Sequence, residues 1–227
     1  MQREEFLANV RQAALAGREH RITTAPIPPG TGYVGAEGDL CAAMAREVNE
    51  VGGSAVIVAD DATALAAYER LVDLYQMKSV VAWHHPLLER IGARAMLARR
   101  GIEWLDYSAL ASLSEETRRT KLVAAGGCLS SADYAIAETG TLLVCARPGQ
   151  ERLASLIAPV YVAIIERAQI VPDLFDAFAR LQALGFADIP SNIALITGPS
   201  KSGDIELQLT TGVHGPGKWH VIVIAGS

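Results

Sequence analysis

A carboxylate, an ammonium group and an imidazole stand in three separate glycine-containing motifs of this sequence. Glu138 lies in a polar turn, residues 137–141, between two apolar runs, where a carboxylate can act as a base or as a nucleophile. Alternatively, Glu138 bonds the backbone of its own turn or pairs with an arginine such as Arg147, and the sequence leaves both interpretations open. The candidate contacts of this first motif are Glu138, Thr139 and Gly140.

The second motif, residues 198–204, follows an apolar run and precedes an expected short helix. Such a turn presents free backbone N–H groups and the positive end of a helix dipole to an anion. Lys201 adds a charged donor that a helix cap does not need, whereas Ser202 or Asp204 as N-cap explains the other residue types. The order G-x-x-x-x-G-K-[ST] of an ATP-binding loop is absent. The candidate contacts are Gly198, Ser200, Lys201 and Asp204.

The third motif is the loop at residues 211–217, which holds three glycines and precedes the last apolar run. A structural turn explains its glycines and its proline, and a functional loop explains its histidine as well. Gly212 and His214 are its candidate ligand contacts. We expect the three motifs to fold to one rim of a sheet and to line a single pocket.

Two other motifs favour structural interpretations. Residues 30–35 have the spacing G-x-G-x-x-G, but prolines rather than a strand precede them, so a linker is favoured over a dinucleotide-binding loop. His84 and His85 follow an expected strand, and neighbouring strand residues point to opposite faces. We therefore expect one of these histidines to cap a helix or lie in the core and the other to be exposed, with contact to a small ligand as the alternative.

The elements that must position these residues follow an alternating pattern from residue 39 onward. Strands are expected at 55–59, 80–83, 102–105, 134–136, 141–145, 160–165, 193–196 and 219–224. Helices are expected at 40–51, 65–75, 87–99, 112–123, 173–184 and 204–209. This alternation predicts an α/β fold with a mostly parallel wound sheet flanked by helices. Residues 1–38 are expected to form an arm, with a helix at 2–17 and a proline- and glycine-rich stretch after it.

Composition limits the classes of function. Half of the 227 residues are apolar, which suffices for a core, and the net charge of -5 disfavours nucleic acid as a partner. Cys41, Cys128 and Cys145 form no C-x-x-C pair, which disfavours a disulfide framework, a zinc site or an iron–sulfur site in this chain. No apolar run approaches the ~20 residues of a membrane span, and no leader pattern opens the sequence. We expect a cytoplasmic protein that binds no metal and contacts no membrane.

Three motifs stand in order along the chain: residues 132–142 (Ala-Asp-Tyr-Ala-Ile-Ala-Glu-Thr-Gly-Thr-Leu), residues 197–201 (Thr-Gly-Pro-Ser-Lys) with 204–206 (Asp-Ile-Glu), and residues 212–216 (Gly-Val-His-Gly-Pro). Together they resemble the LUD-domain family, over roughly residues 40–225. The resemblance implies a LUD-type domain at 39–227. It also implies a fold similar to the group of glucosamine-6-phosphate deaminase, ribose-5-phosphate isomerase and the CoA-transferases.

The same resemblance implies a role in lactate utilization, in the oxidation of L-lactate to pyruvate beside iron–sulfur proteins. The chain lacks the cysteine-rich tail of a larger partner of this family, so the resemblance places the clusters on partners and makes this chain an accessory, ligand-binding subunit. The alternative is a stand-alone enzyme acting on a small anionic metabolite. In that mechanism Glu138 is the base or nucleophile and residues 198–201 hold the anion.

Overall fold

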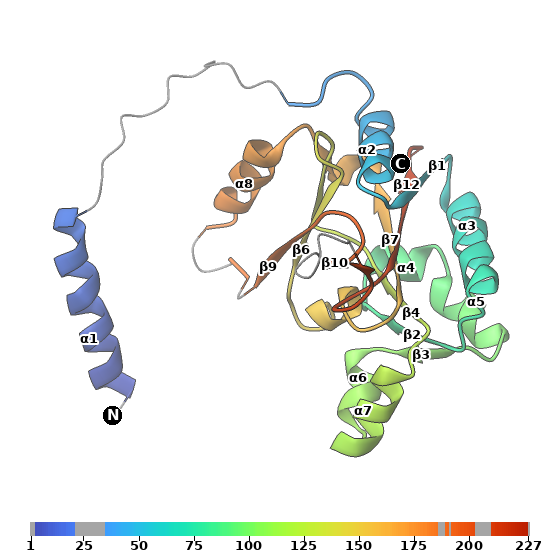
Figure 1. The fold of residues 1–227 in the computed structure, drawn as a ribbon, viewed down its shortest axis with the longest axis horizontal. Coiled ribbons are helices and arrows are strands. Elements are labelled where there is room, and N and C mark those ends of the chain that lie inside the picture. The colour runs from blue at the N-terminus through green and yellow to red at the C-terminus, as the bar shows by residue number, and fades with distance from the viewer. Residues whose placement is uncertain (1–2, 21–34, 186–188, 191, 203–209, 227) are drawn as a thin grey trace. The chain divides into compact units, whose positions relative to one another are not determined.

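The computed structural model of this chain describes residues 3–20, 35–185, 189–190, 192–202 and 210–226 (Figure 1). The chain divides into two units, Met1–Tyr33 and Val34–Ser227. In the first unit, the helix expected at 2–17 is present as α1 (Arg3–Ala16), and the 3-10 turn η1 (Gly17–His20) follows it. Every side chain of α1 is exposed. Most of the G-x-G-x-x-G segment lies outside the described residues.

A six-stranded parallel sheet forms the centre of the second unit. Its strands, in spatial order, are β1 (Ser54–Val58), β12 (Lys218–Ile224), β7 (Val160–Glu166), β4 (Gly127–Ser130), β2 (Ser79–Ala82) and β3 (Glu103–Leu105). All five pairings are parallel. The central strand β7 is buried from Val160 through Ile165, because elements cover both faces of a parallel sheet. The expected α/β class is confirmed.

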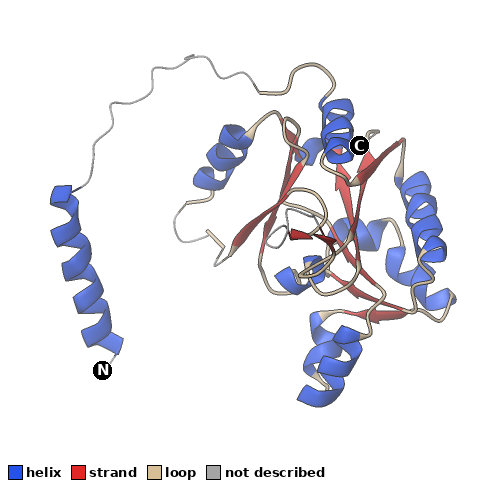
Figure 2. Cartoon of the chain, in the orientation of Figure 1, coloured by secondary structure: helices blue, strands red, loops and turns tan. Residues whose placement is uncertain are grey.

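Helices flank these strands (Figure 2). They are α2 (Leu40–Glu50), α3 (Asp61–Leu74), α4 (Pro86–Arg90), α5 (Ala93–Arg99), α6 (Tyr107–Ala111) and α7 (Glu115–Val123). The packing of α2 matters most for the predicted motifs, because α2 contacts β1 and β12 of the parallel sheet and also β8 (Ile170–Val171) of a second sheet. Met44 and Val48 are its fully buried apolar side chains of largest size.

The second sheet has four strands in the order β8, β5 (Tyr134–Ile136), β6 (Thr141–Cys145) and β9 (Ile193–Ile196). Its side chains alternate between two faces, as strand geometry requires. Ala135, Leu142 and Val144 join the main core, whereas Ile136 and Leu143 pack with α8 (Leu174–Ala183). The two strands 134–136 and 141–145 were expected, but their separation into a second, largely antiparallel sheet was not.

The structure corrects two expected helices. The helix expected at 87–99 is two helices, α4 and α5, because Gly92 between them has φ +76°, a left-handed conformation that ends a helix. The helix expected to begin with a cap at Ser112 begins one turn later, where Ser114 accepts from the Thr117 N–H. Ser112 instead ends α6, a helix that was not expected.

Among the described helices, none has both the length and the apolar character needed to cross a membrane.

Candidate functional site

Segments of the first and second motifs meet at the C-terminal end of α2. A Cβ added to Gly140 would lie 2.6 Å from the backbone nitrogen of Val48, and one added to Gly198 would lie 2.9 Å from the carbonyl oxygen of Val51. Both glycines also have positive φ, +62° and +78°. Only glycine combines this backbone conformation with so close an approach. The two glycines expected to contact a ligand therefore pack against the end of a helix.

A chain of three hydroxyl groups joins the first two motifs. The Oγ1 atom of Thr141 lies 2.7 Å from that of Thr139 and 2.7 Å from that of Thr197. Thr141 is buried, whereas Thr139 and Thr197 are exposed. Because Thr141 begins β6 and Thr197 directly follows β9, this hydrogen bond holds the first motif against the second.

The second and third motifs also lie side by side. The Ser200 N–H donates to the carbonyl oxygen of Pro216, and the Gly212 N–H donates to the carbonyl oxygen of Ser200, each at 2.9 Å. Next to this contact, β10 (Lys201–Ser202) pairs antiparallel with β11 (Thr210–Thr211). The structure therefore brings the backbones of all three motifs together, which is one part of the prediction that they line a single pocket.

Among the candidate side chains Glu138, Lys201 and His214, the first two contact backbone atoms. The Glu138 carboxylate accepts from the Leu174 N–H at 3.4 Å, at the N-terminus of α8, where a negative charge is stabilised. The Lys201 ammonium donates to the carbonyl oxygen of Val51 at 2.8 Å. His214 is exposed, and Asp204 lies outside the described residues. None of the three described side chains contributes to the wall of any of four cavities that described residues form at the edges of the parallel sheet.

The described part of the second motif contains a short strand that was not expected. Lys201 and Ser202 form strand β10, so no helix begins at these residues. The reason is local, because their extended backbone pairs with Thr210 and Thr211. The helix expected at 204–209 lies outside the described residues.

His84 and His85 stand at the carboxyl end of β2, the edge at which open α/β sheets bind ligands. The Nδ1 atom of His85 accepts from the Leu87 N–H at 3.2 Å and so caps α4. Burial lowers the pKa of His85, and the charges of Asp133 and Glu166 oppose this effect. The His84 side chain is 69% exposed and faces Glu89 at 3.7 Å. The expectation of one capping and one exposed histidine is confirmed.

A buried polar network lies at the carboxyl end of β4. The hydroxyl oxygens of Ser130 and Tyr161 are 2.7 Å apart, and the side-chain amide of Gln169 donates to the Oγ atom of Ser131 at 3.2 Å. Both serines are fully buried, and burial raises the pKa of Tyr161. Every hydroxyl of this network has a partner, so the network fixes the chain where the parallel sheet passes into β5.

Asp133 and Arg147 form an ion pair beside this network. The other carboxylate oxygen of Asp133 accepts from the Cys145 N–H at 2.7 Å. Arg147 was considered as a partner of Glu138 in the sequence; its partner in the structure is Asp133, which stands before β5 rather than after it. Hydrogen bonds and the charge of Asp133 raise the pKa of Arg147 against the opposing effect of burial, which is the largest single influence.

A cavity of about 400 Å³ opens at the carboxyl ends of β1, β12 and β7, and Asp60, Asp61, Arg90 and Glu166 line it. The Arg90 guanidinium bonds Asp61 through Nε at 2.8 Å and through Nη2 at 3.1 Å, and it bonds Glu166 at 2.7 Å. These bonds, that to Asp61 first, raise the pKa of Arg90. The carboxylates outnumber the guanidinium, so this cavity does not favour an anion. These residues come from separate segments, and no motif in the sequence connects them.

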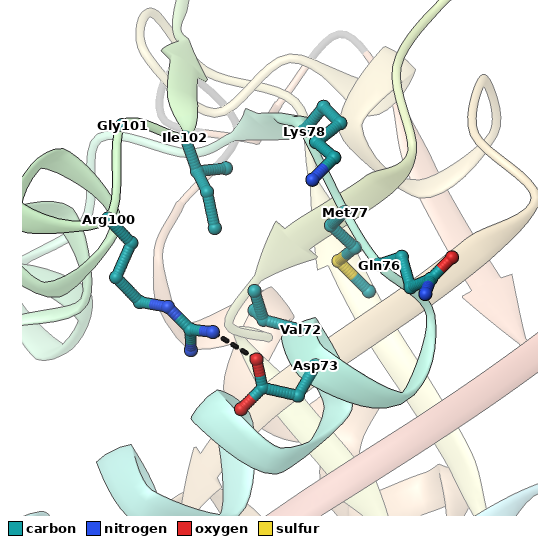
Figure 3. A pocket seen from close by; sticks show the side chains of 8 residues that line it. All are labelled: Val72, Asp73, Gln76, Met77, Lys78, Arg100, Gly101 and Ile102. Atoms are coloured by element: carbon teal, nitrogen blue, oxygen red, sulfur yellow. Dashed lines mark hydrogen bonds and ion pairs between the residues drawn. The ribbon is translucent and has the colours of Figure 1, made fainter.

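The cavity in Figure 3 lies at the opposite, amino edge of the sheet. It measures about 440 Å³, and the end of α3 and the residues that precede β2 and β3 line it. Lys78 extends into it, but Arg100 turns toward the Asp73 carboxylate and pairs with it. Because ligands of parallel α/β sheets bind at the carboxyl ends of the strands, this cavity is the weaker candidate.

The three cysteines are buried as free thiols. Burial raises the pKa of Cys128 and of Cys145 to about 11 and also raises that of Cys41. A protonated thiol is a poor nucleophile. In the part of the chain that the structure describes, no group of three or more His, Cys, Asp or Glu side chains is arranged to hold a metal ion.

Comparison with known proteins identifies similar sequences. The family model described as LUD domain matches residues 41–224. The protein named Lactate utilization protein C of Halalkalibacterium halodurans is 31% identical over 160 residues, which cover 70% of this chain and 67% of that protein. The protein of the same name from Geobacillus thermodenitrificans is 29% identical over 235 residues, covering 98% of this chain and 95% of that protein.

A solved structure has a similar fold. It is the crystal structure of a DUF162 family protein from Deinococcus radiodurans, which matches with a TM-score of 0.59 and 21% identity. The match covers 82% of this chain and 96% of that chain. At this identity the likeness concerns the fold alone.

Proposed function

This chain belongs to the LUD domain family, and on that premise we propose that it serves lactate utilization as an accessory subunit. The complex in which it acts contains iron–sulfur proteins and oxidises L-lactate to pyruvate in the cytoplasm. The observation that carries this proposal is the similarity to proteins named Lactate utilization protein C, which extends over nearly the whole chain in one of them.

The geometry of the three motifs supports an accessory role. Glu138 and Lys201 hold backbone groups of α8 and of the segment after α2, and Gly140 and Gly198 allow close packing on α2. A catalytic acid or base must reach a substrate atom, whereas these side chains reach other parts of the chain. The same contacts reduce the support for the stand-alone enzyme in which Glu138 and the loop at 198–201 perform the reaction.

The cysteines support the placement of the redox centres on partners. An iron–sulfur cluster of the common type needs four thiolate ligands, and this sequence has three cysteines. All three are buried as free thiols. The electron-transferring groups therefore belong to the other proteins of the complex, and this chain contributes structure or ligand binding.

The proposal is tested by deletion and association together. Deletion of this protein should abolish or slow growth on L-lactate and leave growth on glucose unchanged, and a plasmid copy should restore it. The purified chain should co-elute with the iron–sulfur lactate-utilization proteins of its own organism in gel filtration. Normal growth of the deletion strain on L-lactate would refute the role, and separate elution would refute the accessory-subunit assignment.

A further inference from the structure

Two adjoining cavities, the first of them at the carboxyl ends of β2 and β3, carry an inference that goes beyond the proposed function. One measures about 390 Å³ and the other about 670 Å³, both within the ~300–1,000 Å³ of small-molecule sites. Tyr107 and Glu151 line both cavities, so the two are neighbours along a shared wall. We call the pair the arginine cleft, after Arg118 in the first cavity and Arg147 and Arg152 in the second.

The position of the arginine cleft is that of a ligand site. Ala82 and Leu105, the last residues of β2 and β3, line the first cavity, and ligands of parallel α/β sheets bind outside these strand ends. The helices α6 and α7 and the 3-10 turn η2 (Arg152–Ser155) form the rest of the wall. Figure 1 shows α6 and α7 beside β3 and β2.

The charge of the arginine cleft is opposite to that of the whole chain. Three guanidinium groups and one carboxylate line it, whereas the chain has a net charge of -5. Arg147 is paired with Asp133, and the Glu151 carboxylate accepts from the Gly149 N–H at 2.9 Å. Among the described residues, Arg118 and Arg152 have no carboxylate partner. A concave surface with unpaired cations concentrates anions.

The first cavity is also apolar. Its lining includes the side chains Val81, Leu105, Leu110, Leu122 and Leu153. Arg118 is the only cation in this wall among the described residues, and it is half-buried. A guanidinium beside a leucine-lined chamber matches a ligand that has one anionic end and an apolar chain. The anionic end then pairs with the guanidinium, and the apolar chain packs against the leucines.

We propose that the arginine cleft binds an organic anion with an apolar chain, whose carboxylate or phosphate contacts Arg118 and whose chain fills the leucine-lined cavity. Arg152 and the paired Arg147 raise the local potential at the entrance. L-lactate is not this ligand, because its single methyl group cannot fill the chamber. The ligand is therefore distinct from the substrate of the proposed complex, and the site can be tested without the partner proteins.

Isothermal titration calorimetry of the full chain with acetate, butanoate, hexanoate and octanoate tests the proposal. The dissociation constant should fall ~4-fold for each added methylene until the chamber is full. A comparison of octyl phosphate with octanoate shows whether the site prefers a phosphate or a carboxylate head group. Binding of either eight-carbon compound supports the site. An absence of any dependence on chain length, or binding of inorganic phosphate as tight as that of the octyl compounds, would overturn the proposal.

Matched variants locate the binding. R118Q should weaken octanoate binding by ~10-fold or more, because a charge-assisted hydrogen bond is lost. R119Q, at the exposed neighbour on α7, should leave it unchanged. A111F should block the chamber, since Ala111 is exposed and lines it, while A179F on α8 serves as its control. Equal effects of R118Q and R119Q, or unaltered binding by folded A111F, would contradict the assignment.

Discussion

Thr141 and Thr197, 56 residues apart in the chain, share a hydrogen bond of 2.7 Å between their hydroxyl oxygens. The hydroxyl of Thr141 also contacts that of Thr139. This arrangement connects two motifs that resemble the LUD-domain family at one end of the second sheet, where β6 begins and β9 ends. These threonines therefore stabilise the fold, and the free energy of unfolding of threonine variants measures their contribution.

We expect T141V to destabilise the fold by about 1–3 kcal/mol, because two hydrogen bonds of a buried hydroxyl are lost. Urea unfolding measures this as a lower midpoint with an unchanged slope. T139V is the matched control, since it removes one of these two hydrogen bonds from an exposed residue and leaves the bond between Thr141 and Thr197; its cost should stay below that of T141V. Equal costs would contradict a structural role specific to the buried hydroxyl.

We expect G140A to be more destabilising than G101A. Both glycines have positive φ, +62° and +67°, which costs a non-glycine residue roughly 1–2 kcal/mol. An added Cβ meets no atom within 4 Å at Gly101, but at Gly140 it would meet the Val48 nitrogen at 2.6 Å. The excess for G140A should be about 1–3 kcal/mol, measured by urea unfolding. Equal losses would contradict close packing of this turn on α2.

The pH dependence of stability should reflect two half-buried histidines. Burial is the main cause that lowers the pKa of His85 and of His220. The unfolded chain then binds more protons than the folded chain near and below its histidine pKa of ~6.5. The free energy of unfolding should therefore be highest above that pH and should decrease as the pH falls.

The double variant H85N/H220Q tests this pH dependence. Asparagine at 85 preserves a cap for α4, and glutamine at 220 can still bond the Tyr75 hydroxyl, which lies 2.9 Å from His220 in the structure. Urea unfolding at several pH values between ~5 and ~7 should give a shallower slope for the double variant. An unchanged slope would mean that other groups cause the pH dependence.

The cysteines should be unreactive in the folded chain. With a pKa of about 11 for Cys128 and Cys145, only ~0.1% of these thiols is ionised at pH 8, and burial also blocks access. Ellman's reagent should react with all three thiols after unfolding in guanidinium chloride and with none rapidly before. Fast labelling of the folded protein would contradict the burial on which the placement of the redox centres depends.

The alternation of apolar runs and helical stripes predicts most of the fold. The strand at residues 160–165 has apolar side chains at nearly every position, as a strand with two covered faces requires, and the structure places β7 at the centre of the sheet. The break of the expected helix 87–99 at Gly92 was not predicted, because the spacing of apolar residues does not show that this glycine adopts positive φ. The start of the helix expected at 112–123 was placed too early, because helix α6, which ends at Ser112, was not expected.

The candidate sites show a different limit. The sequence correctly predicts that the three motifs meet and that His84 and His85 have different roles. Glu138, Lys201 and His214, which were expected to share one pocket, line none of the four cavities. It does not show where side chains point, so the contact of Lys201 with Val51 was not expected. The arginine cleft was also missed, because Arg118 comes from α7 and Arg152 from a turn after β6, and only the sheet order brings β2 and β3 next to them.

The most direct test of the proposed function is the rate of L-lactate oxidation by the iron–sulfur proteins of the same organism, with and without this chain. Electron transfer to an artificial dye reports that rate. The proposal predicts that the complete set oxidises L-lactate to pyruvate and that omission of this chain reduces the rate markedly, while its re-addition restores it. An equal rate in the absence of this chain would contradict its role as a subunit of the complex.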